Sequence, residues 1–343
     1  MNILYQFNEK YAPYAGVSIT SLFENNREVK EIYVYVLGED LSKKSQEKFK
    51  KLAGDYEEKG KIRRVEFIGT DKLVSKMKAL NMPTYRGSYA ANMRLFVGDV
   101  IEEIATSKIH RLLYLDADTI VTGNLKEMYS SKIKTLGMVY DTLAGDHKYS
   151  IGLGSEDGYY NSGVILIDVD KWLANDFTGR IVEHVQKVRA QYPSPDQDLI
   201  NVVVRDEISP LPVSCNFQPH LRDYSYVSFM KAFAPYPFYS GKEVAAASGE
   251  PAILHAFRYL GQFCWHKHNL HPFNYEFNKY LRKSPWKDYV KEKVADGPVM
   301  KAERLMYRLL PKDIFLQIFR LAHKGFYNKA DAKSKENKIS KAM

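Results

Sequence analysis

The sequence predicts an α/β fold in which a mostly parallel, mixed sheet is flanked by helices. Strand-like and amphipathic helical segments alternate along the first half of the chain, as they do in such sheets. The chain has 343 residues, 45% of them hydrophobic and 27% charged, so it can bury a sizeable core. The apolar run 111–116 ends at two aspartates, and ligands of parallel sheets bind beyond the carboxyl ends of the strands.

The expected elements follow this alternation from the N-terminus. Strands are predicted at 2–7, 31–38, 62–68 and 111–116, and helices at 14–26, 42–56 and 89–101. Later segments are a strand at 135–141, a glycine-rich loop near the site at 144–158, a strand at 161–170 and a helix at 176–192. Residues 206–275 carry many Pro, Tyr and His residues and are expected to be irregular.

The net charge of +9 is concentrated at the end of the chain. Residues 301–343 hold eleven lysines and arginines against four aspartates and glutamates, so the first 300 residues carry a net charge of only +2. This distribution argues against a nucleic-acid-binding groove across the main domain.

The same basic region has amphipathic character. Segments 303–310 and 312–323, separated by Pro311, place apolar residues at helical spacing among lysines and arginines. A basic amphipathic helix of this kind binds an anionic membrane surface, or alternatively packs on its own domain. We expect a main domain at 1–280 and a basic amphipathic helical tail at 281–343, with the membrane as the favoured partner of the tail.

The sequence shows no signal for export or membrane insertion. The N-terminus lacks a basic segment followed by an apolar stretch, and no window approaches the roughly 18 apolar residues of a spanning helix. Cys215 and Cys264 are then expected to be free thiols in a reducing compartment. The expected location is the cytoplasm, peripheral on the inner face of the membrane.

Asp116 and Asp118 are candidate metal ligands. Alternate residues of an extended chain point the same way, so both carboxylates can face one ligand. Adjacent carboxylates repel unless a proton or a cation lies between them, and Mg²⁺ and Mn²⁺ take carboxylate oxygens and often bridge to phosphates. Taken alone, the pattern equally fits a turn in which an aspartate caps the next segment.

Six motifs accompany this pair along residues 1–275. They are NILYQFNEKYAPYAGVSITSL, YAANMRL, LLYLDADTIV, YYNSGVILID, SPDQDLIN and ILHAF. In their order and spacing they resemble glycosyltransferase family 8, and among its members the bacterial lipooligosaccharide galactosyltransferases. Each motif is modest alone, and the six in order make the resemblance specific.

The resemblance implies a GT-A fold, which is a Rossmann-like domain for nucleotide sugars. It also implies a UDP-hexose donor, Mn²⁺ (with Mg²⁺ possible) and retention of the anomeric configuration. Asp116, Asp118 and His255 would bind the metal, and a set of carboxylates and imidazole suits Mn²⁺ better than Ca²⁺. Considered alone, His255 is more typical of a hydrogen-bonded core histidine.

The resemblance also implies a donor-binding set. Its members are Gln6, Asn8, Tyr11, Arg94, Asp116, Ala117, Asp118, Asn161, Ser162, His255, Arg258 and Gln262. Asn8 would offer an amide to the uracil edge, Tyr11 a ring to the base, and Arg94 a guanidinium to phosphate or sugar. Without the resemblance, an ordinary strand-to-helix turn and a solvated helix arginine are the simpler interpretations.

Asp196 and Gln197 are the implied catalytic residues. Asp196 would accept hydrogen bonds from sugar hydroxyls, and Gln197 resembles the residue beside the anomeric carbon opposite UDP. An amide is a poor nucleophile, so Gln197 is expected to stabilise positive charge at that carbon while the acceptor attacks from the side that UDP leaves. A covalent intermediate on a carboxylate is the other route to retention, and PDQD also fits an ordinary proline-started helix.

The stretch HAFRYLGQFCWHKH departs from the family pattern. Members often follow the histidine with Gly and then Lys-Pro-Trp, whose lysine binds the diphosphate. Here Trp265 matches the tryptophan, and Arg258 or Lys267 is expected to supply the missing cation. The same stretch contains His266, His268 and His271, which are possible zinc ligands. It lacks paired cysteines or other ligands at the spacing of a zinc finger, which argues against a zinc site.

Two other functions are alternatives to the transferase hypothesis. An apolar strand followed by Asp-x-Asp-x-Thr also resembles haloacid-dehalogenase-type phosphatases, which usually place that motif on their first strand. A non-catalytic nucleotide-sugar-binding module is the second. The favoured hypothesis is a metal-dependent retaining hexosyltransferase that moves galactose or glucose from a UDP-sugar to a glycan or lipid-linked acceptor in surface polysaccharide synthesis.

Overall fold

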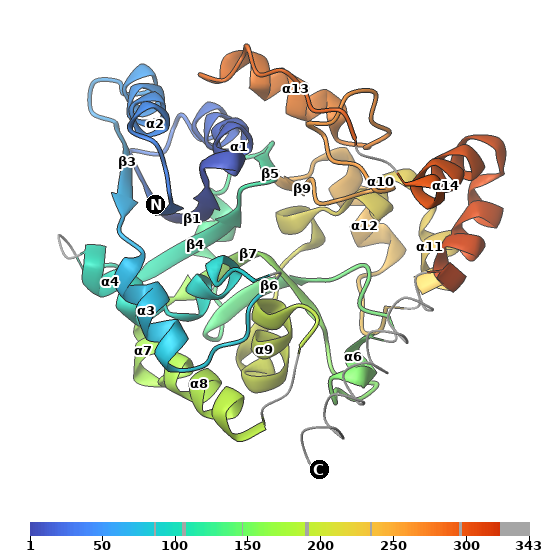
Figure 1. The fold of residues 1–343 in the computed structure, drawn as a ribbon, viewed down its shortest axis with the longest axis horizontal. Coiled ribbons are helices and arrows are strands. Elements are labelled where there is room, and N and C mark those ends of the chain that lie inside the picture. Colours follow the sequence, from blue (N-terminus) through green and yellow to red (C-terminus); the bar gives the residue numbers. More distant parts are fainter. Residues whose placement is uncertain are drawn as a thin grey trace.

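The chain folds around a seven-stranded mixed sheet with helices on both faces (Figure 1). This computed structural model describes residues 1–85, 87–104, 108–145, 147–188, 192–233, 235–294 and 297–322. The predicted α/β class is confirmed.

The sheet has the strand order β3-β2-β1-β4-β7-β6-β8. The strands are β1 (Asn2–Asn8), β2 (Glu31–Glu39), β3 (Ile62–Ile68), β4 (Arg111–Asp116), β6 (Leu136–Tyr140), β7 (Tyr160–Asp168) and β8 (Ile208–Pro210). β1, β2, β3 and β4 run parallel to their neighbours in this group, whereas β7 is antiparallel to both β4 and β6. The chain therefore leaves β1 towards β2 on one side and returns to β4 on the other, which creates a ligand-binding crevice at their carboxyl ends.

Two helical layers bury the two faces of the sheet in separate core clusters. One layer contains α3 (Asp71–Ala79), α4 (Val97–Ile104), α7 (Val169–Ala174), α8 (Phe177–Val188) and α9 (Pro195–Val203). The other contains α1 (Ala12–Asn25), α2 (Lys43–Asp55), α5 (Lys126–Ser130), α10 (Pro219–Asp223), α11 (Tyr226–Phe233), α12 (Gly241–Gly249) and α13 (Asn274–Lys283).

Local sequence explains several of the helix starts. A proline occupies the first turn of α1, and the Ser42 side chain accepts a hydrogen bond from the backbone of Ser45 to cap α2. α12 begins with a capping box in which Ser240 and Glu243 satisfy each other's backbone N–H groups.

A second, two-stranded sheet lies apart from the first. Strand β5 (Thr119–Val121) pairs antiparallel with β9 (Ile253–His255), and Thr119 lies opposite His255. This pairing joins the segment after the aspartate pair to a segment far along the chain.

Three predicted segments differ from the structure in detail. The helix expected at 89–101 is a 3₁₀ helix, η2 (Ala90–Leu95), followed by α4 after a break at Phe96. Consecutive side chains from Asn92 to Val97 are buried, which one face of a surface α-helix cannot achieve. Residues 206–275 contain β8, β9 and three of the helices, each too short for sequence periodicity to reveal. The expected loop 144–158 includes the short helix α6 (His147–Ser150).

The tail begins with two helices that pack on the main domain. They are α14 (Pro298–Leu309) and a helix from 312 to 322, the last described residue. Phe315 and Leu316 are fully buried in the same core cluster as β1 and α1. Residues 323–343 of the predicted tail lie outside the described residues, and no described helix has the length and apolarity needed to cross a bilayer.

Candidate active site

A cavity of about 990 Å³ opens beyond the carboxyl ends of the central strands. Its lining residues are Lys10, Tyr11, Tyr85, Asp116, Asp118, Asp141, Leu143, Ala144, His147, Tyr159, Asn161, Ser194, Gln197, His255, Phe257, Arg258, Gly261, Phe263, His266 and Val294. Seven of the residues predicted from the sequence are among them; six come from five separate motifs, and Arg258 directly follows the last motif.

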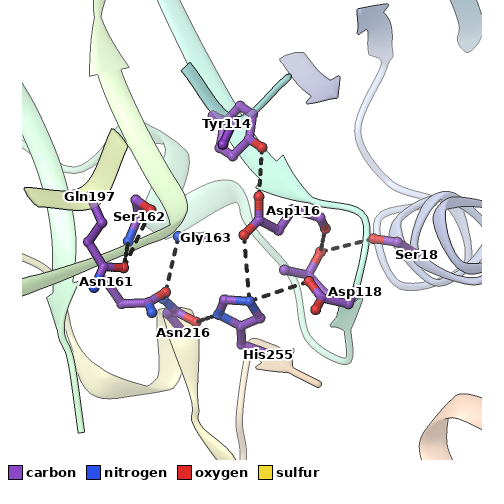
Figure 2. Close-up of polar contacts among 12 residues, drawn as sticks. Ser18, Tyr114, Asp116, Asp118, Asn161, Ser162, Gly163, Gln197, Asn216 and His255 are labelled. Atoms are coloured by element: carbon purple, nitrogen blue, oxygen red, sulfur yellow. Dashed lines mark hydrogen bonds and ion pairs between the residues drawn. The ribbon is translucent and has the colours of Figure 1, made fainter. Parts of the chain in front are cut away.

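Asp116, Asp118 and His255 meet on one wall of this cavity (Figure 2). His255 Nε2 lies 3.4 Å from Asp118 Oδ1 and 3.7 Å from Asp116 Oδ2, and one ligand atom from each residue falls within 4.8 Å of the others. The β5–β9 pairing causes this approach, because it places His255 beside the turn that carries the aspartates. Among the described residues, this is the cluster with three possible metal ligands.

Hydrogen bonding orients the His255 ring towards the carboxylates. Asn216 donates its amide Nδ2 to Asn161 Oδ1, so its own Oδ1 accepts from His255 Nδ1 at 3.1 Å. Nε2 is then the nitrogen that faces Asp116 and Asp118 with a lone pair, as a metal-binding histidine requires. Burial would lower the pKa of His255, but Asp118 and Asp116 outweigh burial and raise the pKa above its ordinary value.

Gly163 provides the space for this ring. A Cβ built at Gly163 would lie 2.1 Å from His255 Cε1, far inside van der Waals contact. The glycine of the YYNSGVILID motif is therefore explained by the position of His255.

The three side chains fit a divalent metal of the Mn²⁺ or Mg²⁺ type. Two carboxylates and one neutral imidazole, with a hydrogen-bonded second nitrogen, form a ligand set that such ions accept. The carboxylates of Asp116 and Asp118 lie close together on one wall and repel each other. A bound metal would offset this repulsion.

Arg94 is buried behind the aspartates and does not line the cavity. Its guanidinium forms ion pairs with Asp116 at 3.0 Å and with Asp196 at 3.5 Å, and donates to the Ser162 carbonyl at 2.7 Å. Burial alone would lower the pKa of Arg94, but Asp116, Tyr114 and Asp196 raise it, so the group stays charged. Arg94 thus holds Asp116 in place in this structure.

Asp196 and Gln197 lie in the first turn of α9, so the interpretation as a proline-started helix also holds. Asp196 accepts a hydrogen bond from Ser162 Oγ at 2.9 Å and is buried away from the cavity lining. Burial raises the pKa of Asp196, and Arg94 opposes this shift.

A chain of hydrogen bonds fixes the Gln197 amide. Gln197 Oε1 accepts from Ser162 N at 3.0 Å, and Nε2 donates to Tyr159 Oη at 3.0 Å and to Asp141 Oδ2 at 3.2 Å. The Tyr159 hydroxyl in turn donates to Asp198 at 2.6 Å, which also contacts His147 Nε2 at 2.8 Å. The Gln197 amide cannot exchange the positions of its oxygen and nitrogen without breaking several of these hydrogen bonds.

The N-terminal turn places Lys10 and Tyr11 on the cavity wall. Asn8 instead caps the short helix that follows, because its Oδ1 accepts from Tyr11 N at 3.3 Å. Gln6 lies opposite Asp116 in the parallel β1–β4 register, and its buried Oε1 has no hydrogen-bond partner. Ala117 lies between the two aspartates and is buried in the core.

The two cationic residues predicted for phosphate binding, both in segment 255–271, lie in different places. Arg258 lines the cavity, whereas Lys267 is exposed elsewhere. Gln262 is buried and its Oε1 accepts from Leu270 N, away from the cavity. Trp265 is stacked between the rings of Tyr14 and Phe263.

The three histidines of that segment do not converge. His271 is buried and bonds to the Phe257 carbonyl, His266 accepts from Phe263 N, and His268 is exposed.

Sequence reasoning missed several residues of the site. Asp141 follows a predicted strand as Asp116 does, so the same rule would have found it. Lys10 also lines the cavity. Asn216 and His147 lie in segments whose sequence gives no comparable signal.

The mixed sheet, the crevice at β1 and β4 and the aspartate–histidine cluster define a glycosyltransferase of the GT-A class. The structure resembles the crystal structure of the galactosyltransferase LgtC in complex with donor and acceptor sugar analogs, with a TM-score of 0.64 and 21% identity over 83% of this chain and 96% of that one. The profile of glycosyl transferase family 8 matches residues 2–238, and the chain belongs to that family.

Curated relatives include bacterial lipopolysaccharide enzymes. The lipopolysaccharide 1,2-glucosyltransferase of Escherichia coli K12 is 27% identical over 300 residues, which are 84% of this chain and 79% of the relative. The lipopolysaccharide 1,3-galactosyltransferase of Salmonella typhimurium is 26% identical over 210 residues, covering 59% of this chain and 58% of that protein. The predicted family and the predicted enzyme class are confirmed.

Proposed function

We propose that this enzyme is a metal-dependent retaining hexosyltransferase that takes galactose or glucose from a UDP-sugar. The acceptor is a glycan or lipid-linked saccharide in surface polysaccharide synthesis, in line with the relatives named above. One observation carries the proposal: a metal-ligand cluster and the fixed amide of Gln197 share one cavity.

Each residue has a chemical task in this proposal. A metal at Asp116, Asp118 and His255 would act as a Lewis acid towards the diphosphate of the leaving UDP. Arg94 holds Asp116 from behind, and Asn161 and Gln197 line the space left for the sugar. Asp196 acts through Ser162 and Arg94, because its carboxylate is bound to both and lies away from the cavity.

Retention is best explained by attack on the face that UDP leaves. The Gln197 nitrogen donates two hydrogen bonds and the carbonyl oxygen accepts one from Ser162 N, so the remaining lone pair of that oxygen is the group able to stabilise positive charge at the anomeric carbon. The neighbouring carboxylate of Asp141 accepts from Asn161, Gln197 and Leu143. Three donors weaken a carboxylate as a nucleophile, which disfavours the covalent route.

The test is UDP release from a panel of UDP-sugars, with Mn²⁺, Mg²⁺ or EDTA. We expect slow metal-dependent hydrolysis of one donor, and its loss in Asp118→Asn. Asp288→Asn, at an exposed aspartate, is the matched control. Binding of UDP and Mn²⁺ without turnover of any donor, even with saccharide acceptors added, would favour the non-catalytic module. The phosphatase interpretation is excluded by the family to which the chain belongs.

We also propose that the tail binds an anionic membrane surface at the inner face of the cell membrane. Leu305, Leu309, Ile314, Ile318 and Leu321 are exposed on the two tail helices, on the side away from buried Phe315 and Leu316. Seven of the nine net positive charges lie in residues 301–343. An exposed apolar stripe in a cationic region matches the chemistry of an anionic bilayer surface.

The membrane proposal is tested by sedimentation with anionic liposomes at low salt. We expect the Leu309→Ser/Ile314→Ser variant to sediment less than the wild type, since each buried leucine or isoleucine side chain contributes about 1.5–3 kcal/mol. Leu173→Ser is the matched control, because Leu173 is 50% exposed on the distant helix α7. Equal sedimentation of all three proteins would rule out the stripe as the membrane contact.

A further inference from the structure

The cavity wall at Arg258 belongs to a tight hairpin that contains backbone strain. Tyr259 and Gln262 exchange two backbone hydrogen bonds, at 2.8 and 2.9 Å, around the turn residues Leu260 and Gly261. Both turn residues have positive φ, 48° for Leu260 and 73° for Gly261. A leucine is rarely found in this left-handed region, and such a residue persists where the surrounding structure holds it.

The first tail helix provides that support. Arg304 of α14 donates from Nη1 to the Leu260 carbonyl at 3.2 Å, and Met300 Sδ lies 4.0 Å from Arg258 Nη2. Met300 Sδ also lies 2.5 Å from the position that a Cβ on Gly261 would occupy, so the helix lies directly against the turn.

Electrostatics strengthens the same contact. Burial raises the pKa of the half-buried Glu303 on α14, and the guanidinium groups of Arg304 and Arg258 oppose this shift. Glu303 lies on the face of α14 that carries Met300, because residues three positions apart share a helix face.

A second attachment holds the base of the hairpin. Asp223 accepts hydrogen bonds from the hydroxyls of Tyr259 and Tyr307, the latter at 2.8 and 2.9 Å. Lys312 Nζ lies 3.3 Å from the same carboxylate and 3.2 Å from the centre of the Tyr307 ring. Both tail helices are thus joined to the hairpin through one partly buried polar cluster around Asp223.

From these contacts we infer that α14 is part of the donor site: it positions the 258–261 hairpin so that Arg258 meets the diphosphate. This inference rests on the proposed function. The inference explains which residue replaces the diphosphate-binding lysine of the family's Lys-Pro-Trp segment, because Arg258 lines the cavity and Lys267 does not. The side of the tail that packs against the hairpin therefore serves the donor site. The exposed apolar residues of the tail serve the separate, proposed contact with the membrane.

The experiment measures UDP affinity with Mn²⁺ in the full-length protein. Met300→Ala/Arg304→Ala removes both side chains that touch the turn, and Val299→Ala/Arg308→Ala removes an apolar and an arginine side chain that are exposed on the same helix. We expect the first variant to bind UDP about tenfold more weakly, the effect of misplacing one charge-assisted hydrogen bond. We expect the second to bind UDP like the wild type.

Two further readouts separate positioning from general damage. Mn²⁺ affinity should not change in the first variant, because the metal cluster lies outside the hairpin. In an Arg258→Ala background, adding Met300→Ala/Arg304→Ala should not lower UDP affinity further, because the double change acts by displacing Arg258.

Several outcomes would overturn the inference. UDP affinity within twofold of the wild type in the first variant would do so, as would a full additional loss in the Arg258→Ala background. Wild-type UDP affinity in Arg258→Ala alone would remove Arg258 from the donor site, while the proposed function stands. A wild type that binds Mn²⁺ but no UDP would instead refute the proposed function, and this inference with it.

Discussion

Replacing Gly163 with alanine should displace His255, the histidine that we propose as a metal ligand. The new methyl group would lie 2.1 Å from His255 Cε1, 2.7 Å from Nδ1 and 2.8 Å from Nε2. Carbon atoms pack at about 3.5–4.0 Å, so the ring must move by roughly 1.4 Å or more. Gly163 has an ordinary backbone conformation, so the effect is steric and does not arise from φ strain.

The surroundings of His255 leave the ring little freedom to move. Its side chain is buried, bonded to Asn216 and packed edge-on against Phe257 with ring centres 5.0 Å apart. We expect overpacking to lower the free energy of unfolding by about 1–3 kcal/mol. Metal ligands tolerate displacements of only about 0.2 Å, so we expect Mn²⁺ affinity to fall by roughly 10–100-fold.

Thermal unfolding and Mn²⁺ titration test this prediction through a double-mutant cycle. His255→Ala opens space for the methyl group, so Gly163→Ala should cost much less stability in that background. Gly54→Ala is the matched control, because a Cβ at Gly54 meets nothing within 4 Å. Additive stability losses in the cycle, or unchanged Mn²⁺ affinity in Gly163→Ala, would refute the steric argument.

Three further predictions concern buried groups near the site or in the core. In steady-state kinetics, Tyr159→Phe should lower kcat about tenfold at similar donor KM, because losing a buried hydrogen-bond partner costs about 1–3 kcal/mol and frees the Gln197 amide. Tyr192→Phe, which removes only a bond to His184, should keep its kcat. Burial lowers the pKa of His271 to about 4, so the unfolded chain binds this proton first as the pH falls. Stability contributed by neutral His271 should be complete above a pH of about 6.5 and be lost towards pH 4, and His271→Gln should flatten that slope in pH-dependent denaturation. Burial raises the pKa of the Cys215 thiol to about 12 and also raises the pKa of the Cys264 thiol, so a thiol reagent should label both only in denaturant. Labelling of the native protein would contradict the burial of these two side chains.

The sequence by itself determined the strands β1 to β4 and the helices α1 and α2 that follow β1 and β2. The strand expected at 2–7 is β1 at Asn2–Asn8, and the one expected at 111–116 is β4. These strands are apolar and bounded by polar turns, so local pattern and tertiary demand agree. The position of Asp116 and Asp118 at the end of a strand followed from the same pattern.

Only the tertiary structure decided which side chains meet in the cavity. The β5–β9 pairing brings His255 to Asp118, and three-residue strands carry no readable periodicity. Arg94 turns inward to Asp116 because consecutive residues of η2 are buried, although a solvated helix arginine was the simpler interpretation of the residue alone.

The tail shows the same division between pattern and packing. Its helical spacing was readable, since apolar residues recur on both sides of Pro311. The pattern predicts a helix but not which apolar residues face inward. Packing in the larger core cluster, beside the Tyr307 ring, buries Phe315 and leaves Ile314 exposed, because side chains one residue apart on a helix point to different sides.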